Sequence, residues 1–229
     1  MAAFEGFPAD TIRFLQDLNK NNNREWFADN KQRYEASFLM PALEFIEAMV
    51  KPLEKTAPML RVESKKVGGS LMRIYRDTRF AKDKTPYKTN IGIQFRHRAG
   101  KDVHAPGIYL HIAPEECFLG AGIWRPASDA LTPIRHFIAE NEQAWRKVQR
   151  SKSFNGQFEI YDDRLKSVPR GFAKDHPLIE TLRLKSFLGM AKLARKQVQS
   201  KELPKTVTSL VRSSRPLMEL LCTALNQPY

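Results

Sequence analysis

The stretch from residue 73 to residue 89, RIYRDTRFAKDKTPYKT, holds six lysines and arginines but only two aspartates. Such a density of ammonium and guanidinium groups is typical of a surface that binds phosphate or another anion. Pro86 fixes the local backbone and favours an extended Thr85, which predicts a shaped connection between two strands. Because loops on rigid scaffolds often carry function, we expect this connection to contribute to an anion-binding site.

The two aspartates of this stretch, Asp77 and Asp83, allow two interpretations. They can be ion-pair partners that orient the neighbouring arginines, which requires no chemistry. They can instead be catalytic carboxylates or magnesium ligands, but these roles need a third oxygen donor nearby. The sequence reveals no recognisable set of such donors, so it leaves both interpretations open.

Positive charge is concentrated in two parts of the chain, whose 229 residues carry a net charge of +13. Residues 61–104 contain twelve Lys or Arg against four Asp or Glu, and residues 164–215 contain thirteen against three. A fold that brings these segments together would create a strongly positive surface, which predicts an anionic partner such as nucleic acid or a nucleotide. The alternative is a soluble protein whose lysines are scattered over its outer faces.

Helical spacing of apolar residues begins and ends the chain. Residues 10–18 and 24–55 predict helices capped by Asp10 and Asn23, with a break or restart at Pro41. Further helices are predicted over two later ranges, with an interruption or kink at Pro216 in the second. These ranges are 124–150 and 203–227.

The middle of the chain instead alternates with a period of two, which predicts antiparallel strands. The predicted strands are 69–77, 90–97, 107–114 and 116–124, with a possible further strand at 156–162. Residues 182–194 fit either a strand or a helix. One face of the sheet is expected to pack against the helices and consists of Met72, Ile74, Ile91, Ile93, Phe95, Ile108, Leu110 and Ile112.

The opposite face of this sheet is expected to be polar and to support the ligand. It would combine Arg73, Tyr75, Gln94, Arg96, Tyr109 and His111 with the bare backbone of Gly120 and Gly122. Basic, aromatic and hydrogen-bonding groups beside glycines would allow a flat or phosphorylated ligand to approach closely. The alternative is an ordinary solvent-exposed sheet face, which is normally polar.

Together these elements predict an α+β fold, with an antiparallel sheet packed on one face by helices and with helical segments at both ends. A hydrophobic content of 42% suffices for the core of a single domain over residues 1–229. Cys117 and Cys222 fit no disulfide or zinc pattern and are expected to be core residues. Without a long apolar run or a signal sequence, we expect a cytoplasmic protein with no membrane partner.

Standard catalytic and metal-binding motifs are missing from the sequence. No Walker loop, HExxH, GxSxG or paired CxxC occurs. His97, His104 and His111 are seven residues apart, a spacing that suits no common metal site, so no metal is predicted and the cofactor is left open. The aromatic signature of RNA-recognition domains is not matched either, which leaves sequence-specific reading of nucleic acid unsupported.

Several stretches resemble the family called domain of unknown function 2461. They are NNNREWFADNKQRYE, SLMRIYRDTRFAKDKTPYKTNIGIQF, APGIYLHIAP, GAGIWRP and LKSVPRGFAKDHP. The resemblance extends from about residue 10 to residue 190 and implies a single α+β domain. It implies no catalytic residue.

We predict that the ligand lies where the 73–89 connection meets the polar sheet face. The predicted ligand-binding residues are Arg73, Arg76, Asp77, Arg79, Asp83, Lys84, Tyr87, Lys88, Arg96, Tyr109 and His111.

Three functions fit this prediction. The first is a noncatalytic binder of a phosphate-bearing ligand, with stacking by Tyr87 or Tyr109. The second is an enzyme on such a substrate, with Asp77 or His111 as acid or base. The third is an interaction domain for an acidic protein. The oligomeric state stays open.

Overall fold

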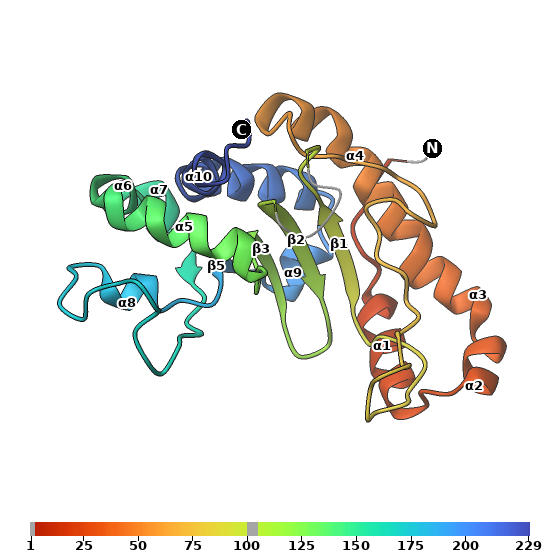
Figure 1. Cartoon of the computed structure of the whole chain (residues 1–229). Helices are drawn as coiled ribbons and strands as arrows, with labels where there is room; N and C mark the ends of the chain where they lie inside the picture. Colours follow the sequence, from red (N-terminus) through yellow and green to blue (C-terminus); the bar gives the residue numbers. More distant parts are fainter. Residues whose placement is uncertain (1–2, 100–104) are drawn as a thin grey trace.

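The computed structural model describes residues 3–99 and 105–229, and its centre is an open antiparallel sheet (Figure 1). Five strands form it in the order β1-β2-β3-β5-β4. Their bounds are β1 Ile91–Phe95, β2 Gly107–Ile112, β3 Cys117–Ile123, β4 Glu159–Ile160 and β5 Phe187–Lys192. All neighbouring strands are antiparallel, and helices pack on the sheet, which confirms the predicted α+β class.

Strand β2 shows the predicted two-residue alternation most clearly. Ile108, Leu110 and Ile112 are fully buried, whereas Tyr109 and His111 are only half-buried on the other face. Successive side chains of a strand point to opposite faces, so the alternation determines which face joins the core. The polar face carries the two residues that the sequence pattern assigned to it.

Two long helices form most of the layer on the apolar face. Helix α10 (Leu203–Ala224) contacts β3 and β5, and helix α4 (Met40–Thr56) contacts β1 and α10. Each helix buries an apolar stripe, as an amphipathic helix on a sheet must. The remaining helices are α1 Ala9–Lys20, α2 Arg24–Asp29, α3 Lys31–Tyr34, the π-helix η1 Glu35–Leu39, α5 Ser128–Glu140, α6 Glu142–Arg150, α7 Lys152–Asn155, α8 Ile179–Leu182 and α9 Arg195–Val198.

The N-terminal helices confirm one predicted cap and correct the other. Asn23 caps α2, because its side chain accepts a hydrogen bond of 2.9 Å from the backbone of Trp26. Asp10 does not cap α1, which Pro8 precedes. Its carboxylate instead accepts two hydrogen bonds, of 2.8 and 2.9 Å, from Arg33. These bonds, assisted by Ser37, lower the pKa of Asp10 to about 2 despite its partial burial.

The predicted strand at 69–77 is wrong. This segment runs beside β1, but it forms only the isolated bridges Leu71–Ile93 and Tyr75–Tyr87. Leu71 and Ile74 are both buried although they are three residues apart, which breaks the alternation that a strand requires. Arg73 and Tyr75 are therefore not part of a regular sheet face.

Three other features of the sequence-based prediction are corrected or resolved. The single helix predicted over 124–150 is two helices, α5 and α6, separated at Asn141. Pro216 does not interrupt α10, whose buried residues continue on both sides of it. The undecided segment 182–194 contains strand β5, and both cysteines are buried and free, as expected. Among the described residues, no helix has the length and apolarity needed to cross a membrane.

Candidate functional site

The two aspartates of the 73–89 connection are ion-pair partners of arginines. The Arg79 guanidinium donates to the Asp77 carboxylate twice, with Nη2–Oδ2 at 2.7 Å and Nε–Oδ1 at 3.0 Å. Arg76 binds Asp83 and the hydroxyl of Thr85. Hydrogen bonds from Arg79 lower the pKa of Asp77, and those from Arg76 and Thr85 lower the pKa of Asp83 to about 2. Both arginines are thus already neutralised within the loop.

Two further predicted residues also have structural partners. The Lys84 ammonium donates to the carbonyl of Thr78 at 2.9 Å. Tyr87 is buried and stacks on Phe27, with ring centroids 4.1 Å apart. The Asn22 side chain bonds both backbone groups of Tyr87 at 3.0 Å. Tyr87 therefore anchors the loop, and its ring is stacked on Phe27 and not exposed to solvent.

Unlike Arg76 and Arg79, Arg73 and Lys88 have no aspartate partner among the described residues. Neither forms an ion pair within the described part of the chain, and the Lys88 backbone donates to the Ile74 carbonyl at 2.7 Å, which draws the two segments together. Partial burial lowers the pKa of Lys88, and the nearby positive charge of Arg73 lowers it further. Arg96 is exposed and donates to Gln94 at 3.1 Å.

Tyr109 and His111 form a small polar cluster with Asn90 on the polar sheet face. The Tyr109 hydroxyl lies 3.3 Å from the Asn90 amide nitrogen and 3.2 Å from Nδ1 of His111. The His111 ring stacks on Phe118 at 4.7 Å. Burial lowers the pKa of His111 and raises that of Tyr109. The structure thus brings these two predicted residues together as a neutral cluster.

The glycines of this face do not leave bare backbone. A Cβ on Gly92 would lie 2.9 Å from the Tyr109 hydroxyl, and one on Gly120 would lie 3.4 Å from Leu188. Gly122 has φ +129°, and a Cβ there would clash with the β5 backbone at 2.1 Å. The glycines therefore make room for neighbouring side chains and strands, and the expected open glycine surface is not present at these positions.

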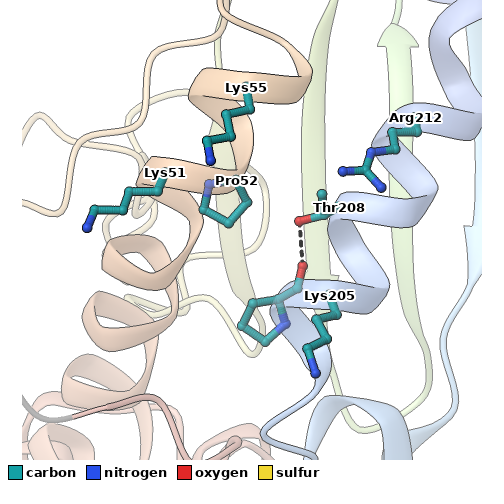
Figure 2. Close-up of a pocket in the computed structure, with 7 residues that line it drawn as sticks. Lys51, Pro52, Lys55, Lys205, Thr208 and Arg212 are labelled. Atoms are coloured by element: carbon teal, nitrogen blue, oxygen red, sulfur yellow. Dashed lines mark hydrogen bonds between the residues drawn. The ribbon is translucent and has the colours of Figure 1, made fainter.

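An open groove of about 520 Å³ lies between α4 and α10, where the sequence patterns predicted no site (Figure 2). Its lining consists of two prolines, a threonine and four cationic residues. These residues are Lys51, Pro52 and Lys55 of α4 with Pro204, Lys205, Thr208 and Arg212 of α10. Residues three, four or seven positions apart share one face of a helix, which explains how each helix contributes several of them.

Most of the groove cations have no carboxylate partner. Lys205 donates to Glu202 at 2.6 Å, and this bond lowers the pKa of Glu202. For Lys51, Lys55 and Arg212 no ion pair occurs within residues 3–99 and 105–229. Figure 2 shows the Arg212 guanidinium extending from α10 toward α4, whereas the tip of Lys51 extends away from α10. The groove is thus a positively charged hollow with an apolar proline floor.

Only a partial signal for this groove is present in the sequence. Lys205 and Arg212 belong to the second basic segment, but Lys51 and Lys55 lie outside both segments. The groove is therefore not formed by the two basic segments coming together. The spacing of Lys51 and Lys55 by four residues could have indicated a cationic helix face. The packing of α4 against α10, which creates the hollow, depends on tertiary structure.

Two other features have less bearing on anion binding. A second cavity, of about 310 Å³, is lined by Gln16, Asn19, Lys20, Pro114 and Glu115, so its charge is mixed. Within the described residues no group of three or more His, Cys, Asp or Glu could hold a metal ion. His97 is buried and bonds the Pro228 carbonyl at 2.7 Å, and His104 lies outside the described residues.

The fold and the groove define an α+β protein with an open antiparallel sheet and a cationic hollow in its helical layer. The chain belongs to the family described as conserved hypothetical protein (DUF2461), whose match covers residues 10–220 and confirms the resemblance noted from the sequence. Comparison with curated proteins finds no match, and comparison with solved structures finds none. We therefore infer the function from the chemistry of the protein surface.

Proposed function

We propose that the protein is a noncatalytic binder of a phosphate-bearing ligand, a nucleic acid or a nucleotide-like molecule, and that the ligand occupies the α4–α10 groove. The observation that carries this proposal is the charge of the groove. Four cations surround a hollow of about 520 Å³, and only Lys205 has a carboxylate partner among the described residues. Positively charged side chains that line one hollow without counter-charges create a positive potential, which attracts anions.

The proline floor strengthens this attraction. A unit charge about 4 Å from an opposite charge gains roughly 1 kcal/mol in bulk water but roughly 4 kcal/mol near a protein surface of lower effective dielectric constant. Pro52 and Pro204 are apolar and half-buried, so they exclude water from one side of a bound anion. An anion in the groove is therefore favoured over one on a flat lysine-covered face.

The spacing of the cations favours a ligand with more than one phosphate. Lys51 and Lys55 are four residues apart on α4, which corresponds to roughly 6 Å along the helix axis. Lys205 and Arg212 are seven residues apart on α10, which corresponds to roughly 10 Å. A single phosphate would neutralise only part of this charge, whereas a polyphosphate or a nucleic-acid strand can place a phosphate beside each cation.

A double charge reversal tests the proposal. We expect inorganic tripolyphosphate to bind the wild type in isothermal titration calorimetry at low salt and to raise its melting temperature. Lys55→Glu with Arg212→Glu should weaken this binding at least ten-fold, because two attractive charges become repulsive. Lys147→Glu with Arg150→Glu on α6 is the matched control, since both residues are exposed and the change in net charge is the same. Equal weakening in both variants would show a net-charge effect and contradict a site in the groove.

An enzyme acting on a phosphorylated substrate is the second candidate, and one observation favours it. His111 is kept neutral by burial and is hydrogen-bonded to Tyr109, which suits a general base at neutral pH. Asp77, the other predicted acid or base, is engaged by Arg79. Hydrolysis of a phosphate ester that is lost in His111→Gln, with the fold intact, would support this candidate over the binder.

A further inference from the structure

The 73–89 connection presents an aromatic ring to solvent. Phe80 is 95% exposed and Tyr75 is 58% exposed, although most large apolar side chains of the described chain are buried. The Arg79 guanidinium lies over the Phe80 ring, 6.0 Å from its centroid. One face of the ring is thus next to a cation and, given the exposure of the side chain, the other face is free for a planar partner.

The loop that carries Phe80 is held by its own charges. Arg79 is paired with Asp77, and Arg76 is paired with Asp83 and Thr85. These contacts link the residues on both sides of the ring and restrict the loop before a partner binds. Preorganisation of this kind lowers the entropic cost of binding.

The base of the loop is fixed to the helical layer. Tyr87 stacks on Phe27 of α2, and Asn22 bonds the Tyr87 backbone twice. The connection is therefore attached to the fold at its base and carries the exposed ring of Phe80 beyond this anchor.

Other cations of the connection have no ion-pair partner in the described part of the chain. Arg73, Lys82 and Lys88 form no ion pair in the described part of the chain, and Arg73 and Lys82 are exposed. Lys88 is half-buried and close enough to Arg73 for the two positive charges to repel each other. An anion beside Arg73 and Lys88 would relieve this repulsion, because it would supply the missing counter-charge.

We propose that the 73–89 connection binds single-stranded nucleic acid, with Phe80 stacked on an unpaired base and with Arg73, Lys82 and Lys88 near the adjacent phosphates. Exposed aromatic rings among cations are the usual platform for single strands, because every base offers a flat face to stack on. The Phe80 ring has the Arg79 guanidinium over one face and solvent on the other. Such a flat, open face suits a planar base better than a flexible acyl chain. This inference names the ligand class of the proposed function and rests on it, but it uses a second surface. Figure 1 draws this connection beside α1, away from the junction of α4 with α10.

Substitution of Phe80 tests the stacking directly. Fluorescence anisotropy would measure binding of a labelled twelve-residue oligothymidylate and of an abasic strand of the same length. Phe80→Ala should weaken oligothymidylate binding about ten-fold, and Phe80→Trp should restore it, because one stacked base contributes on the order of ten-fold in affinity. Phe80→Leu should stay weak, since an aliphatic side chain offers no flat ring. The abasic strand should bind wild type and Phe80→Ala equally.

Trp124→Ala is the matched control. Trp124 is 61% exposed and lies under the Arg125 guanidinium at 5.4 Å, as Phe80 lies under Arg79, but it follows strand β3. This variant should bind oligothymidylate as the wild type does. Equal weakening by Trp124→Ala would show that any exposed ring contributes, and this would overturn the assignment to the loop.

Other outcomes separate the inference from the proposed function. Oligothymidylate binding that is absent in the wild type, or unchanged in Phe80→Ala, overturns the inference, while loss of tripolyphosphate binding in the groove variant still supports the groove. Tripolyphosphate binding that survives the groove charge reversal, together with weaker oligothymidylate binding in Phe80→Ala, supports the loop site and contradicts the groove site. Binding to phosphatidylserine vesicles that Phe80→Leu retains and Phe80→Ala loses, without a stacking effect on oligothymidylate, would assign the loop to a lipid surface and overturn the inference.

Discussion

The 73–89 connection and the α4–α10 groove are both rich in positive charge, but they differ in what opposes it. In the connection, Arg76 and Arg79 each bind an aspartate a few residues away. In the groove, only Lys205 has such a partner among the described residues. Arg76 and Arg79 are therefore neutralised within the connection and shape the loop, whereas Arg73, Lys82 and Lys88 of the same stretch have no ion pair in the described chain.

This difference shows that a high density of lysine and arginine in the sequence does not by itself identify a ligand-binding site. Asp77 and Asp83 are two and seven residues from the arginines that they bind, so the loop can neutralise itself without tertiary structure. The groove cations come from helices about 150 residues apart in the sequence. None of the residues that line the groove is acidic, and Glu202, which pairs with Lys205, is not one of them. Free positive charge arises from packing, which places cations together and leaves carboxylates elsewhere.

The largest expected effect concerns the anchor of the connection. Phe27→Ala removes a buried ring that stacks on Tyr87, and we expect the free energy of unfolding to fall by about 3 to 5 kcal/mol. Urea denaturation followed by circular dichroism measures this change. Phe80→Ala is the control, since its ring is 95% exposed and its loss should change stability by less than about 0.5 kcal/mol. Similar losses in both variants would contradict the division of the loop into an anchored base and a free tip.

The sequence predicted the sheet well because its signal is local. Alternation in β2 separates Ile108 and Leu110 from Tyr109 and His111, and a strand needs nothing else to define its two faces. The prediction from periodicity failed at residues 69–77. There Leu71 and Ile74 are buried by contacts with distant elements, and a local pattern contains no information about such contacts. Local periodicity therefore defines regular elements better than it defines the irregular segments at their edges.

The candidate site was less predictable for the same reason. Arg73 and Lys88 lack ion-pair partners in the described chain, whereas Tyr87 is buried by Phe27 and Asn22, which precede it by about 60 residues. Lys51 and Lys55 lie outside the two basic segments, so the charge distribution along the chain gave no reason to select them. Which aromatic rings and cations face solvent depends on how helices pack, so composition alone could not distinguish them.

The next prediction compares a partly buried ion pair between an aspartate and an arginine with an exposed ion pair of the same kind. Asp10 accepts bonds from Arg33, and its pKa of about 2 lies below its ordinary value of 3.8. A lowered pKa in the folded state gives stability that is present above the unfolded pKa and is lost as the pH falls through the folded value. We expect Asp10→Asn to cost about 1 to 2 kcal/mol at pH 7, with allowance for solvent screening, and this difference from the wild type should shrink between about pH 4 and pH 2.

Urea denaturation at pH 7, 4 and 2.5 measures this dependence. Asp83→Asn is the control, because Asp83 also has a pKa of about 2 but lies in an exposed loop, where ion pairs contribute little to stability. A difference between wild type and Asp10→Asn that is the same at all three pH values would show that the ionised carboxylate is not what stabilises this pair.

The smallest expected effect compares an unpaired arginine of the connection with a paired one. Affinity for single-stranded nucleic acid falls with salt, and the log-log slope changes by about 0.7 for each phosphate contact. Arg73→Ala should therefore make the slope for oligothymidylate shallower by about 0.7, since Arg73 has no ion pair in the described chain. The double variant Asp77→Asn with Arg79→Gln should change it by less than about 0.2. Arg79 would have to break two hydrogen bonds to Asp77 before it could reach a phosphate. Anisotropy titrations at five salt concentrations resolve this difference. Equal slope changes in the two variants would mean that the paired arginine also contacts phosphate, so that pairing with Asp77 does not decide which arginine binds the strand.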